Sequence, residues 1–577
     1  MSLLNNIDKN LIEDIFNSNE FKGWLLSRRW FGDKSILSNL EFGISLEYFA
    51  VISRKIILTI IKINKPEYKK SYFLPVIYYK NLESILEKSE KNTANILLLT
   101  ENTFSKKVAL TSDGSQKIYT LNLIEAEFCL FFWQNMLFEK KITEGFPNFS
   151  LELSLYQEQF QDKENMEKVQ HLIEASIYSN RYEKRLTQLG GGNTSNILFR
   201  LDLINLKASN QSKFSYVLKS YKEFSESIEP SALFVLVKNQ YPNAPKIYGT
   251  IKILNQETVG ILENVQHDFN LGQIYWNELN KMIEKTLTEG TFNINKMEDK
   301  KYITSRIMDN CPKTLKLSLE IGREILNLHK SLLLESNREY QREVIDGQHL
   351  LNQYSNSINN MISDLQEIME KKSKKAFYNL PKVSSLLIDT KDLIEKFRSK
   401  FQKEKVEIQP VHQDLHMENI LVSINDSDGN FKYYFLDFEG DPQLTDQERN
   451  KKFPAEKDFA SLLRSLSYIK FNSLLKYIEE NVLDKEKYEV PEEVLYNLFF
   501  RKAGKYNTTE LNKILTLFNA WEQKFMNKIL KDIDIDFTLI NILTIERILH
   551  ELNYEILFRP HKFIVPLLGL KEVIEKN

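Results

Sequence analysis

The hydrophobic pattern changes its period along this chain of 577 residues. Between residues 40 and 125 apolar and polar side chains mostly alternate, which predicts half-buried strands. From residue 270 to the end apolar positions recur at helical spacing, most clearly over 317–334. The pattern therefore predicts an α+β protein with a β-rich N-terminal part and a mainly helical C-terminal part.

Shorter segments predict the individual elements. The expected strands lie at 42–46, 49–59, 72–78, 95–99, 117–121, 186–189, 197–203, 214–221 and 259–265. The expected helices of the first half lie at 123–137, 164–175 and 231–240. Residues 345–404 predict a pair of long surface helices with no chemistry of their own.

Two polar loops, each following an apolar segment, hold the residues with the clearest chemistry. Asp414 stands five residues before Asn419 on the first loop, and Asp437 ends the apolar strand 433–436. Phosphoryl transfer needs a base near the acceptor hydroxyl and hard oxygen ligands for Mg²⁺. Asp414 suits the base, whereas Asn419 and Asp437 suit the metal. The competing interpretation, ordinary turn and capping residues, requires two spaced motifs to coincide by chance.

Two histidines flank the candidate base. We expect His412 to organise the loop by hydrogen bonding rather than to act as an acid or base. His412 and His416, with acids nearby, also suggest a transition-metal site. No third soft ligand is evident, and Mg²⁺ suits the oxygen ligands better.

A glycine-rich turn at 190–196 separates two expected strands, and a third strand carries Lys219. Backbone amides and the side chains of Asn193, Thr194 and Ser195 can approach phosphate oxygens at such a turn. Lys219 can meet the same phosphates. Each signal alone is weak, and their order before the two acidic loops strengthens both.

The apolar strand 259–265 runs into a linker. At this position a hinge strand would present backbone groups to an adenine edge, so Glu263 and Val265 are candidate nucleotide contacts. Together with the glycine-rich turn and Lys219, this hinge strand therefore completes a possible nucleotide site.

The composition excludes several classes of protein. The net charge is −2 and the pI is about 6.5, so no general basic field draws the chain to nucleic acid or to a membrane. The two cysteines, Cys129 and Cys311, lack metal-type spacing and provide no disulfide framework. The N-terminus lacks a signal-peptide pattern, and the apolar runs are too short to span a bilayer. We expect a soluble, cytoplasmic protein.

An aromatic and basic stretch at 24–34 contains Trp24, Trp30 and Phe31, interleaved with Arg28 and Arg29. It could form a ligand platform. Residue type favours the alternative, a packed aromatic anchor with arginines that extend to solvent.

The sequence resembles the maltokinase branch of the aminoglycoside-phosphotransferase-like kinases. The two polar loops are similar to that family's His-Gly-Asp-Tyr-His loop and Leu-Asp-Phe-Glu-Gly-Glu-Pro turn. The resemblance extends, at modest density, over nearly the whole chain. The matching segments are 24–34, 193–196, 412–419, 436–442, 457–465 and 551–560.

The resemblance implies a bilobal fold like that of eukaryotic protein kinases. Its expected domains are a β-rich cap at 1–130, a small lobe at 131–268 and a helical lobe at 269–577. It implies ATP and Mg²⁺ as cofactors, and the conversion of maltose to maltose 1-phosphate. It also implies a place in glycogen and trehalose metabolism, a trehalose synthase partner, and a monomer or homodimer. The candidate sugar-pocket residues are His416, Asp458, Arg464, Tyr554, Glu555 and Arg559.

The sequence departs from the family at three places. The family has a helical glutamate that pairs with the lysine, whereas alignment places Leu233 there, with Glu226 and Glu229 out of register. The segment 335–405 is longer than usual. Asn419 stands where maltokinases often have glutamine, which is closer to the general kinase pattern.

Three functions stay open at this point. One is a maltokinase-like sugar kinase, and a second is a related kinase acting on another acceptor, such as the 6-hydroxyl of an amino sugar. The third is a pseudokinase or carbohydrate-binding regulator, against which the complete set of Asp414, Asn419 and Asp437 argues. The candidate pocket residues could also form buried ion pairs between helices.

Overall fold

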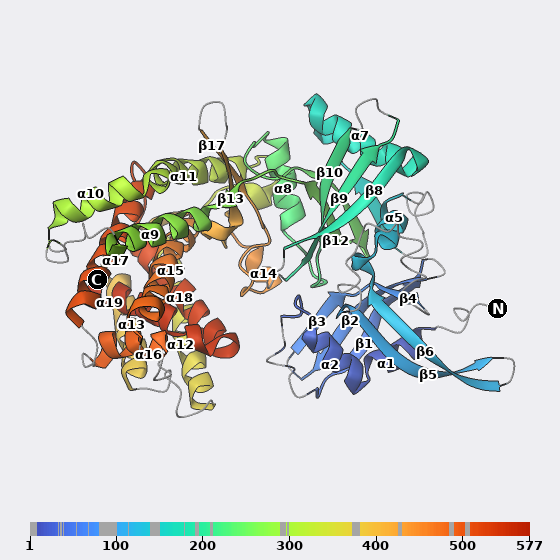
Figure 1. Ribbon diagram of the computed structural model, residues 1–577, viewed down its shortest axis with the longest axis horizontal. Helices are drawn as coiled ribbons and strands as arrows, with labels where there is room; N and C mark the ends of the chain where they lie inside the picture. Colours follow the sequence, from blue (N-terminus) through green and yellow to red (C-terminus); the bar gives the residue numbers. More distant parts are fainter. Residues whose placement is uncertain are drawn as a thin grey trace. The chain divides into compact units, whose positions relative to one another are not determined.

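The computed structural model divides into two compact units, drawn in Figure 1. Unit 1 comprises Met1–Lys238 and Pro245–Val265, and unit 2 comprises Asn239–Ala244 and Gln266–Asn577. The structure describes residues 8–32, 34, 37, 40–52, 55–66, 68–79, 101–112, 115–138, 150–177, 179–190, 195–207, 212–288, 296, 299–371, 381–424, 430–483, 490–501 and 508–577.

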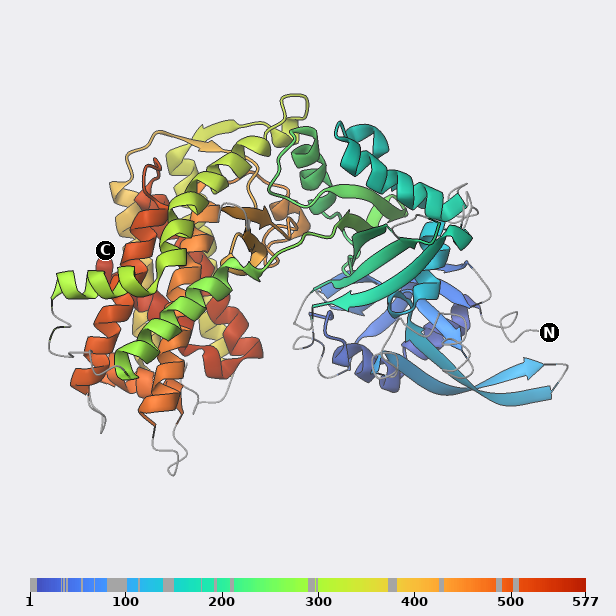
Figure 2. The same cartoon turned by 45° about the horizontal axis from the view of Figure 1, so that its top comes forward.

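The first part of unit 1 is an antiparallel sheet in the order β1-β2-β4-β6-β5, with β3 pairing β2. Strands β5 and β6 form a long hairpin (Figure 2). Helix α1 packs near β1 and begins at Asp8, whose side chain accepts the Leu11 N–H. The elements are α1 (Lys9–Phe16), α2 (Asn19–Ser27), β1 (Gly43–Val51), β2 (Ile56–Lys65), β3 (Tyr68–Phe73), β4 (Val76–Tyr79), β5 (Thr103–Ser112), β6 (Ser115–Glu125) and the 3₁₀ helix η2 (Ala126–Phe128).

The second part of unit 1 is an antiparallel sheet in the order β7-β11-β12-β10-β9-β8. Lys219 on β10 lies opposite Leu198 of β9 and Gly260 of β12, so it sits inside the sheet rather than at an edge. The elements are α5 (Leu130–Phe138), β7 (Leu151–Leu155), η3 (Gln157–Gln159), α7 (Lys163–Ile177), η4 (Ser179–Arg181), β8 (Tyr182–Leu189), β9 (Ile197–Asn205), β10 (Lys213–Ser220), α8 (Glu229–Lys238), β11 (Ile247–Ile253) and β12 (Gln256–Glu263).

Backbone hydrogen bonds join the two sheets of unit 1. The chain that follows β10 runs beside β3, where the Phe73 N–H donates to the Lys222 carbonyl over 2.8 Å. The Phe224 N–H donates to the Ser71 carbonyl over 2.7 Å. The strand that carries Lys219 therefore continues directly into the edge of the first sheet.

Unit 2 is mainly helical, as the sequence predicts. Helix α15 packs on α17, α18 and α19, and α11 packs on α17 so closely that a Cβ added at Gly322 would overlap the Ile529 carbonyl oxygen. The helices are α9 (Leu271–Thr288), α10 (Lys300–Asn310), α11 (Pro312–Ser331), η6 (Arg338–Tyr340), α12 (Gly347–Lys371), α13 (Pro381–Lys400), α14 (Asp446–Arg449), α15 (Glu456–Asn481), α16 (Pro491–Tyr496), the π-helix η10 (Asn497–Arg501), α17 (Thr508–Ile529), α18 (Phe537–Phe558), η11 (Pro560–Lys562) and α19 (Ile564–Lys576). Among the described helices, none combines the length and the apolar character needed to span a bilayer.

Two small antiparallel sheets lie within unit 2. One has the order β13-β16-β17, and the other pairs β14 with β15. The β16–β17 hairpin sets the position of the two polar loops, since the first loop enters β16 and the second leaves β17. The elements are β13 (Phe269–Asn270), β14 (Glu343–Asp346), β15 (Lys405–Ile408), η8 (Met417–Asn419), β16 (Ile420–Ile424) and β17 (Phe431–Phe435).

Several expected boundaries are wrong. The strand expected at 49–59 runs across the reversal between β1 and β2, and the one expected at 72–78 covers parts of β3 and β4. The helix expected at 123–137 starts too early, because β6 continues through Glu125 and α5 begins at Leu130. Ser53, Arg54 and Lys55 interrupt the apolar run between β1 and β2, whereas β3 and β4 follow one another along β2 without a reversal. The strand expected at 95–99 lies outside the described residues.

Candidate functional site

The first polar loop is fixed to helix α15 by Asp458. Its Oδ2 accepts the His412 N–H over 2.9 Å, and its Oδ1 accepts the Gln413 N–H over 2.8 Å. His329 Nε2 lies 2.7 Å from Oδ2. Burial alone would raise the pKa of Asp458, but the His329 contact, the nearby His412 and the backbone donors lower it below its usual value. Asp458 therefore holds the loop as a buried, ionised acceptor.

Asp458, which the sequence predicts in a sugar pocket, lies outside the cavity of unit 2. The side chain is fully buried, both oxygens are used by the loop and by His329, and Asp458 is not among the residues that line the cavity described below. Asp458 belongs to the first turn of α15, which packs against the loop that the side chain anchors.

Replacing Asp458 by asparagine is expected to lower the free energy of unfolding by about 3 kcal/mol, because an amide cannot accept all of these hydrogen bonds. Urea denaturation of the purified variant measures the loss. Asp389→Asn, on an exposed position of α13, is the matched control and should change stability by less than about 0.5 kcal/mol. Equal stability of the two variants would contradict the anchoring role.

His412 connects the two polar loops. Its buried ring lies 2.7 Å, through Nε2, from the Leu436 carbonyl oxygen. The ring also lies against Phe438, with centroids 4.7 Å apart. These are the contacts of a side chain that organises the loops, and they hold the segment before Asp437 against the first loop.

Asp414 lies within the first loop and contacts Arg547, a residue that no motif in the sequence indicated. Arg547 Nη1, from α18, lies 2.7 Å from Asp414 Oδ1, and His416 Nε2 lies 3.8 Å from Oδ2. Asn419 Nδ2 donates to the Asp414 carbonyl over 3.2 Å. Burial favours a lower pKa for Arg547, but Asp414 and other carboxylates raise that pKa above its usual value. Arg547 therefore stays charged and orients the Asp414 carboxylate.

Asn419 and Asp437 stand at the same end of the β16–β17 hairpin. Ile420 pairs with Phe435, and the Leu436 N–H donates to the Asn419 carbonyl over 2.9 Å. Asp437 has a φ of +66°, a left-handed conformation that Asp tolerates better than most residues. Carboxylate and amide oxygens are ligands that suit Mg²⁺, so the donor set fits that ion.

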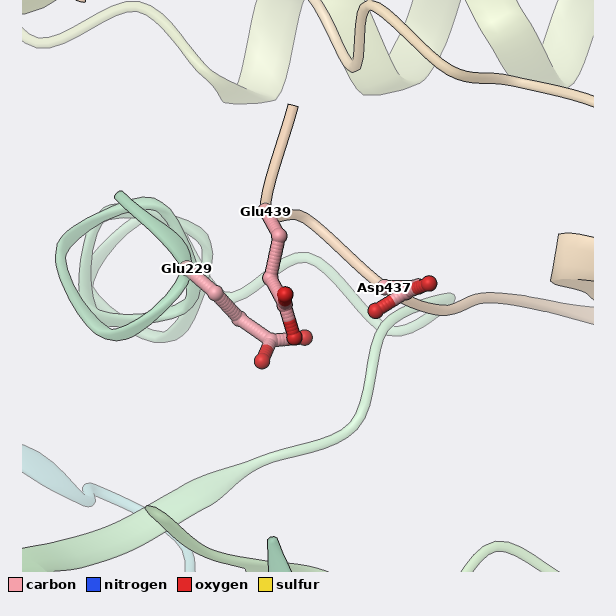
Figure 3. Close-up of side chains that lie close together, drawn as sticks. All are labelled: Glu229, Asp437 and Glu439. Atoms are coloured by element: carbon pink, nitrogen blue, oxygen red, sulfur yellow. The ribbon is translucent and has the colours of Figure 1, made fainter. Parts of the chain in front are cut away.

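Figure 3 shows the acidic side chains of this loop, Asp437 and Glu439, together with Glu229 of helix α8. Further along the loop Asp441 is buried, and its carboxylate lies 3.6 Å from Lys457 Nζ of α15. Burial would raise the pKa of Asp441, but Lys457 and Arg547 lower it below its usual value. The second loop is thereby tied to α15 as the first is.

A cavity of about 810 Å³ opens within unit 2 beside the first loop. Helices α9, α15 and α18 and the loop around His416 provide its walls. It contains three aromatic side chains, Trp276, Tyr468 and Tyr554. Of the six residues expected in a sugar pocket, five line this cavity: His416, Arg464, Tyr554, Glu555 and Arg559.

Ion pairs organise the polar part of the cavity wall. Arg464 Nη2 lies 2.7 Å from Glu551 Oε2, and Arg559 Nη2 lies 2.6 Å from Glu555 Oε1. The Tyr468 hydroxyl also donates to Glu555 Oε1, over 2.8 Å. Glu555 Oε2 is buried and accepts no hydrogen bond within the described part of the chain. The sequence left two interpretations of these side chains open, pocket lining and ion pairs. The same side chains do both.

Lys219, in unit 1, has a carboxylate partner that the alignment did not identify. Its Nζ lies 2.7 Å from Glu229 Oε2, and the Tyr221 hydroxyl donates to the same oxygen over 2.8 Å. Leu233, the aligned position, lies one turn further along α8 and offers no charge. The alignment misses Glu229 because α8 begins at this residue, which places the glutamate one turn before the aligned position.

The other nucleotide candidates lie around the same sheet. Ser195 is exposed just before β9, whereas Asn193 and Thr194 lie outside the described residues. Glu263 ends β12, and its side chain accepts the Lys246 N–H over 3.2 Å. Val265 follows in the segment that leaves this sheet.

The two units form a mixed α/β protein, with a β-rich part and a helical part, whose fold is similar to that of solved kinases. A structure of glucosamine kinase in complex with glucosamine, ADP and inorganic phosphate superposes with a TM-score of 0.50 at 11% identity, covering 92% of this chain and 95% of that one. Glucosamine kinase in crystal form A gives a TM-score of 0.46 at 11% identity, over 92% and 91% of the two chains. No protein-family model matches the sequence, and no curated protein shows significant similarity to it. The expected fold class is confirmed.

Proposed function

We propose that the protein is an ATP-dependent kinase that phosphorylates a sugar hydroxyl. One observation supports this most directly: Asp414 contacts Arg547 and lies near His416, and both of these residues line the cavity. The carboxylate thus lies next to two residues that line a pocket of sufficient size for a sugar. In the proposed reaction Asp414 accepts the proton of the acceptor hydroxyl as that oxygen attacks the γ-phosphoryl group.

The proposed nucleotide-binding part is a small lobe at 131–268 with a cap at 1–130, and most of both lies in unit 1. The ion pair of Lys219 with Glu229 supports it, because such a pair positions the lysine for the nucleotide phosphates. Asn419 and Asp437 would hold Mg²⁺, which would neutralise charge on the β- and γ-phosphates. The superposed glucosamine kinase is in complex with ADP and inorganic phosphate, in keeping with this proposal.

Maltose is the acceptor we propose first. The cavity offers three aromatic faces, which suit stacking on sugar rings. Its carboxylates Glu551 and Glu555 are each already paired with an arginine, so the wall carries little uncompensated negative charge. A neutral sugar fits such a wall better than a cation does. Links to glycogen and trehalose metabolism, and to a trehalose synthase, belong to this proposal.

Glucosamine is the second candidate, and a specific feature favours it. Glu555 Oε2 is buried without a hydrogen-bond donor among the described residues, and an ammonium group of an amino sugar would satisfy it. The superposed kinase is in complex with glucosamine, which belongs to the same class of acceptor.

A coupled assay of ADP release tests both candidates. The purified protein with Mg-ATP is offered maltose, glucosamine, glucose and aminoglycosides in parallel, with ATP alone as the background. Turnover with maltose alone supports maltokinase, and turnover with glucosamine alone supports the second candidate. Absence of turnover with every sugar, together with retained sugar binding, would favour a carbohydrate-binding pseudokinase instead.

A further inference from the structure

A buried ion pair lies where the two sheets of unit 1 meet. Lys222 Nζ and Glu127 Oε1 are 2.5 Å apart, and both side chains are completely inaccessible to solvent. Lys222 belongs to the segment that follows β10, and Glu127 belongs to η2 at the end of the first sheet. Isolated buried charges are costly, so a pair at this depth is held by the fold around it.

The pair contacts both elements that are expected to hold a nucleotide. Glu127 Oε1 also accepts the Ser220 hydroxyl over 3.1 Å, and Ser220 follows Lys219 directly on β10. The Lys222 N–H donates to Asn196 Oδ1 over 3.2 Å, and Asn196 joins the glycine-rich turn to β9. One ion pair therefore connects the first sheet to the end of β10 and to the start of β9.

The surroundings make Glu127 the counter-charge of Lys222. The neighbouring Glu125 is fully buried, and its Oε1 accepts the Trp30 indole N–H over 2.5 Å. Burial raises the pKa of Glu125 to about 7, even though Lys222 and Arg28 act to lower it. Glu127, 2.5 Å from Lys222 Nζ, is the carboxylate that pairs directly with the lysine.

The aromatic stretch at 24–34 closes this cluster. Trp30 is 5% exposed, and Lys222 Nζ lies 4.6 Å from the centre of its ring. Arg28 Nη1 lies 3.7 Å from Glu125 Oε2. These residues pack as an anchor around the buried charges, the alternative that residue type favoured over a ligand platform.

We propose that Lys222 and Glu127 are positioning residues for nucleotide binding, through which the first sheet fixes Lys219 and Asn196, at the start of β9. The inference rests on the proposed function, since it assumes that unit 1 binds ATP. Neither residue needs to touch the nucleotide. The pair instead holds the end of β10 and the start of β9 in one arrangement. Little free energy is then lost in ordering these segments when phosphate groups bind.

The test is a double variant, Lys222→Met with Glu127→Gln, which removes both charges while retaining similar volumes. ADP and a non-hydrolysable ATP analogue are titrated into the full-length protein by calorimetry, and KM is measured separately for ATP and for the sugar. We expect Kd for nucleotide and KM for ATP to rise about tenfold, the size typical of losing a supporting partner. The KM for the sugar should stay within about twofold, because the cavity lies wholly in unit 2.

A matched control separates positioning from general destabilisation. Lys470 in unit 2 is also completely buried and pairs with Glu522 and Glu572 over 2.8 and 2.7 Å. Lys470→Met should lower thermal stability while leaving the Kd for nucleotide unchanged. Ser220→Ala keeps the Lys222–Glu127 pair and removes only its link to β10, so it should raise the Kd by a smaller factor.

The outcomes are distinguishable. Wild-type protein that binds no nucleotide overturns the proposed function and this inference together. Wild-type binding with an unchanged Kd in the folded double variant overturns this inference alone, as does an equal rise in Kd for Lys470→Met. If the double variant does not fold, Ser220→Ala decides, and a Kd equal to that of the wild type overturns the proposal.

Discussion

Asp414→Asn is expected to lower kcat by about 10²- to 10⁴-fold, the contribution usual for a general base. An amide has nearly the same shape as the carboxylate but cannot accept the proton of the acceptor hydroxyl. The fold should persist, because the Asp414 carbonyl oxygen, which accepts the Asn419 amide, is unchanged. Steady-state ADP release with the active sugar measures kcat, and calorimetry checks that nucleotide still binds.

Glu395→Gln is the control for this substitution. Glu395 is a half-exposed carboxylate on α13 that lies 3.0 Å from Arg398, so it resembles the Asp414–Arg547 pair without facing the cavity. Its kcat should match that of the wild type. A kcat near the wild-type value for Asp414→Asn would show that another group is the base, or that none is needed.

The sequence predicted the two parts of the fold better than the edges of their elements. Alternation and helical spacing describe which face of an element is buried, and they separated the β-rich unit from the helical one. They do not fix where a strand ends, so one expected strand ran across the β1–β2 reversal and another joined β3 to β4, which follow one another along β2. The pairing of β3 with the chain around Glu223 joins segments about 150 residues apart, which no local pattern contains.

In the candidate site, too, local patterns predicted some residues and gave no signal for others. Asp414, Asn419 and Asp437 could be predicted together because they lie at short spacings on the loops that enter and leave the β16–β17 hairpin. Arg547 reaches Asp414 from a helix more than 100 residues later, and its only local signal is its position four residues before Glu551. The position of Asp458 could not be predicted from its motif, because a motif names a residue without saying what covers it. Because the loop covers Asp458, its carboxylate accepts hydrogen bonds from the loop backbone and anchors it.

Asp437→Asn should impair metal-dependent turnover without disturbing the loop. Asparagine tolerates the left-handed conformation at φ +66° about as well as aspartate does, whereas alanine would add backbone strain. The substitution removes a full negative charge from the proposed Mg²⁺ ligands. Metal-assisted stabilisation of phosphoryl transfer is worth several kcal/mol, so kcat should fall by on the order of 10³-fold. The Mg²⁺ concentration needed for half-maximal activity should also rise.

The measurement is a titration of Mg²⁺ at fixed, saturating ATP and sugar, for the variant and the wild type side by side. Asp446→Asn provides the matched control, since Asp446 is an exposed aspartate on α14 that pairs with Arg449 over 2.7 Å. That variant should reproduce the wild-type curve, because its charge lies on a surface helix and an exposed ion pair contributes little. If Asp437→Asn gave the same curve as Asp446→Asn, Asp437 would not be a metal ligand. A lower kcat with an unchanged Mg²⁺ midpoint would instead indicate that Asp437 supports the loop conformation and does not bind the metal.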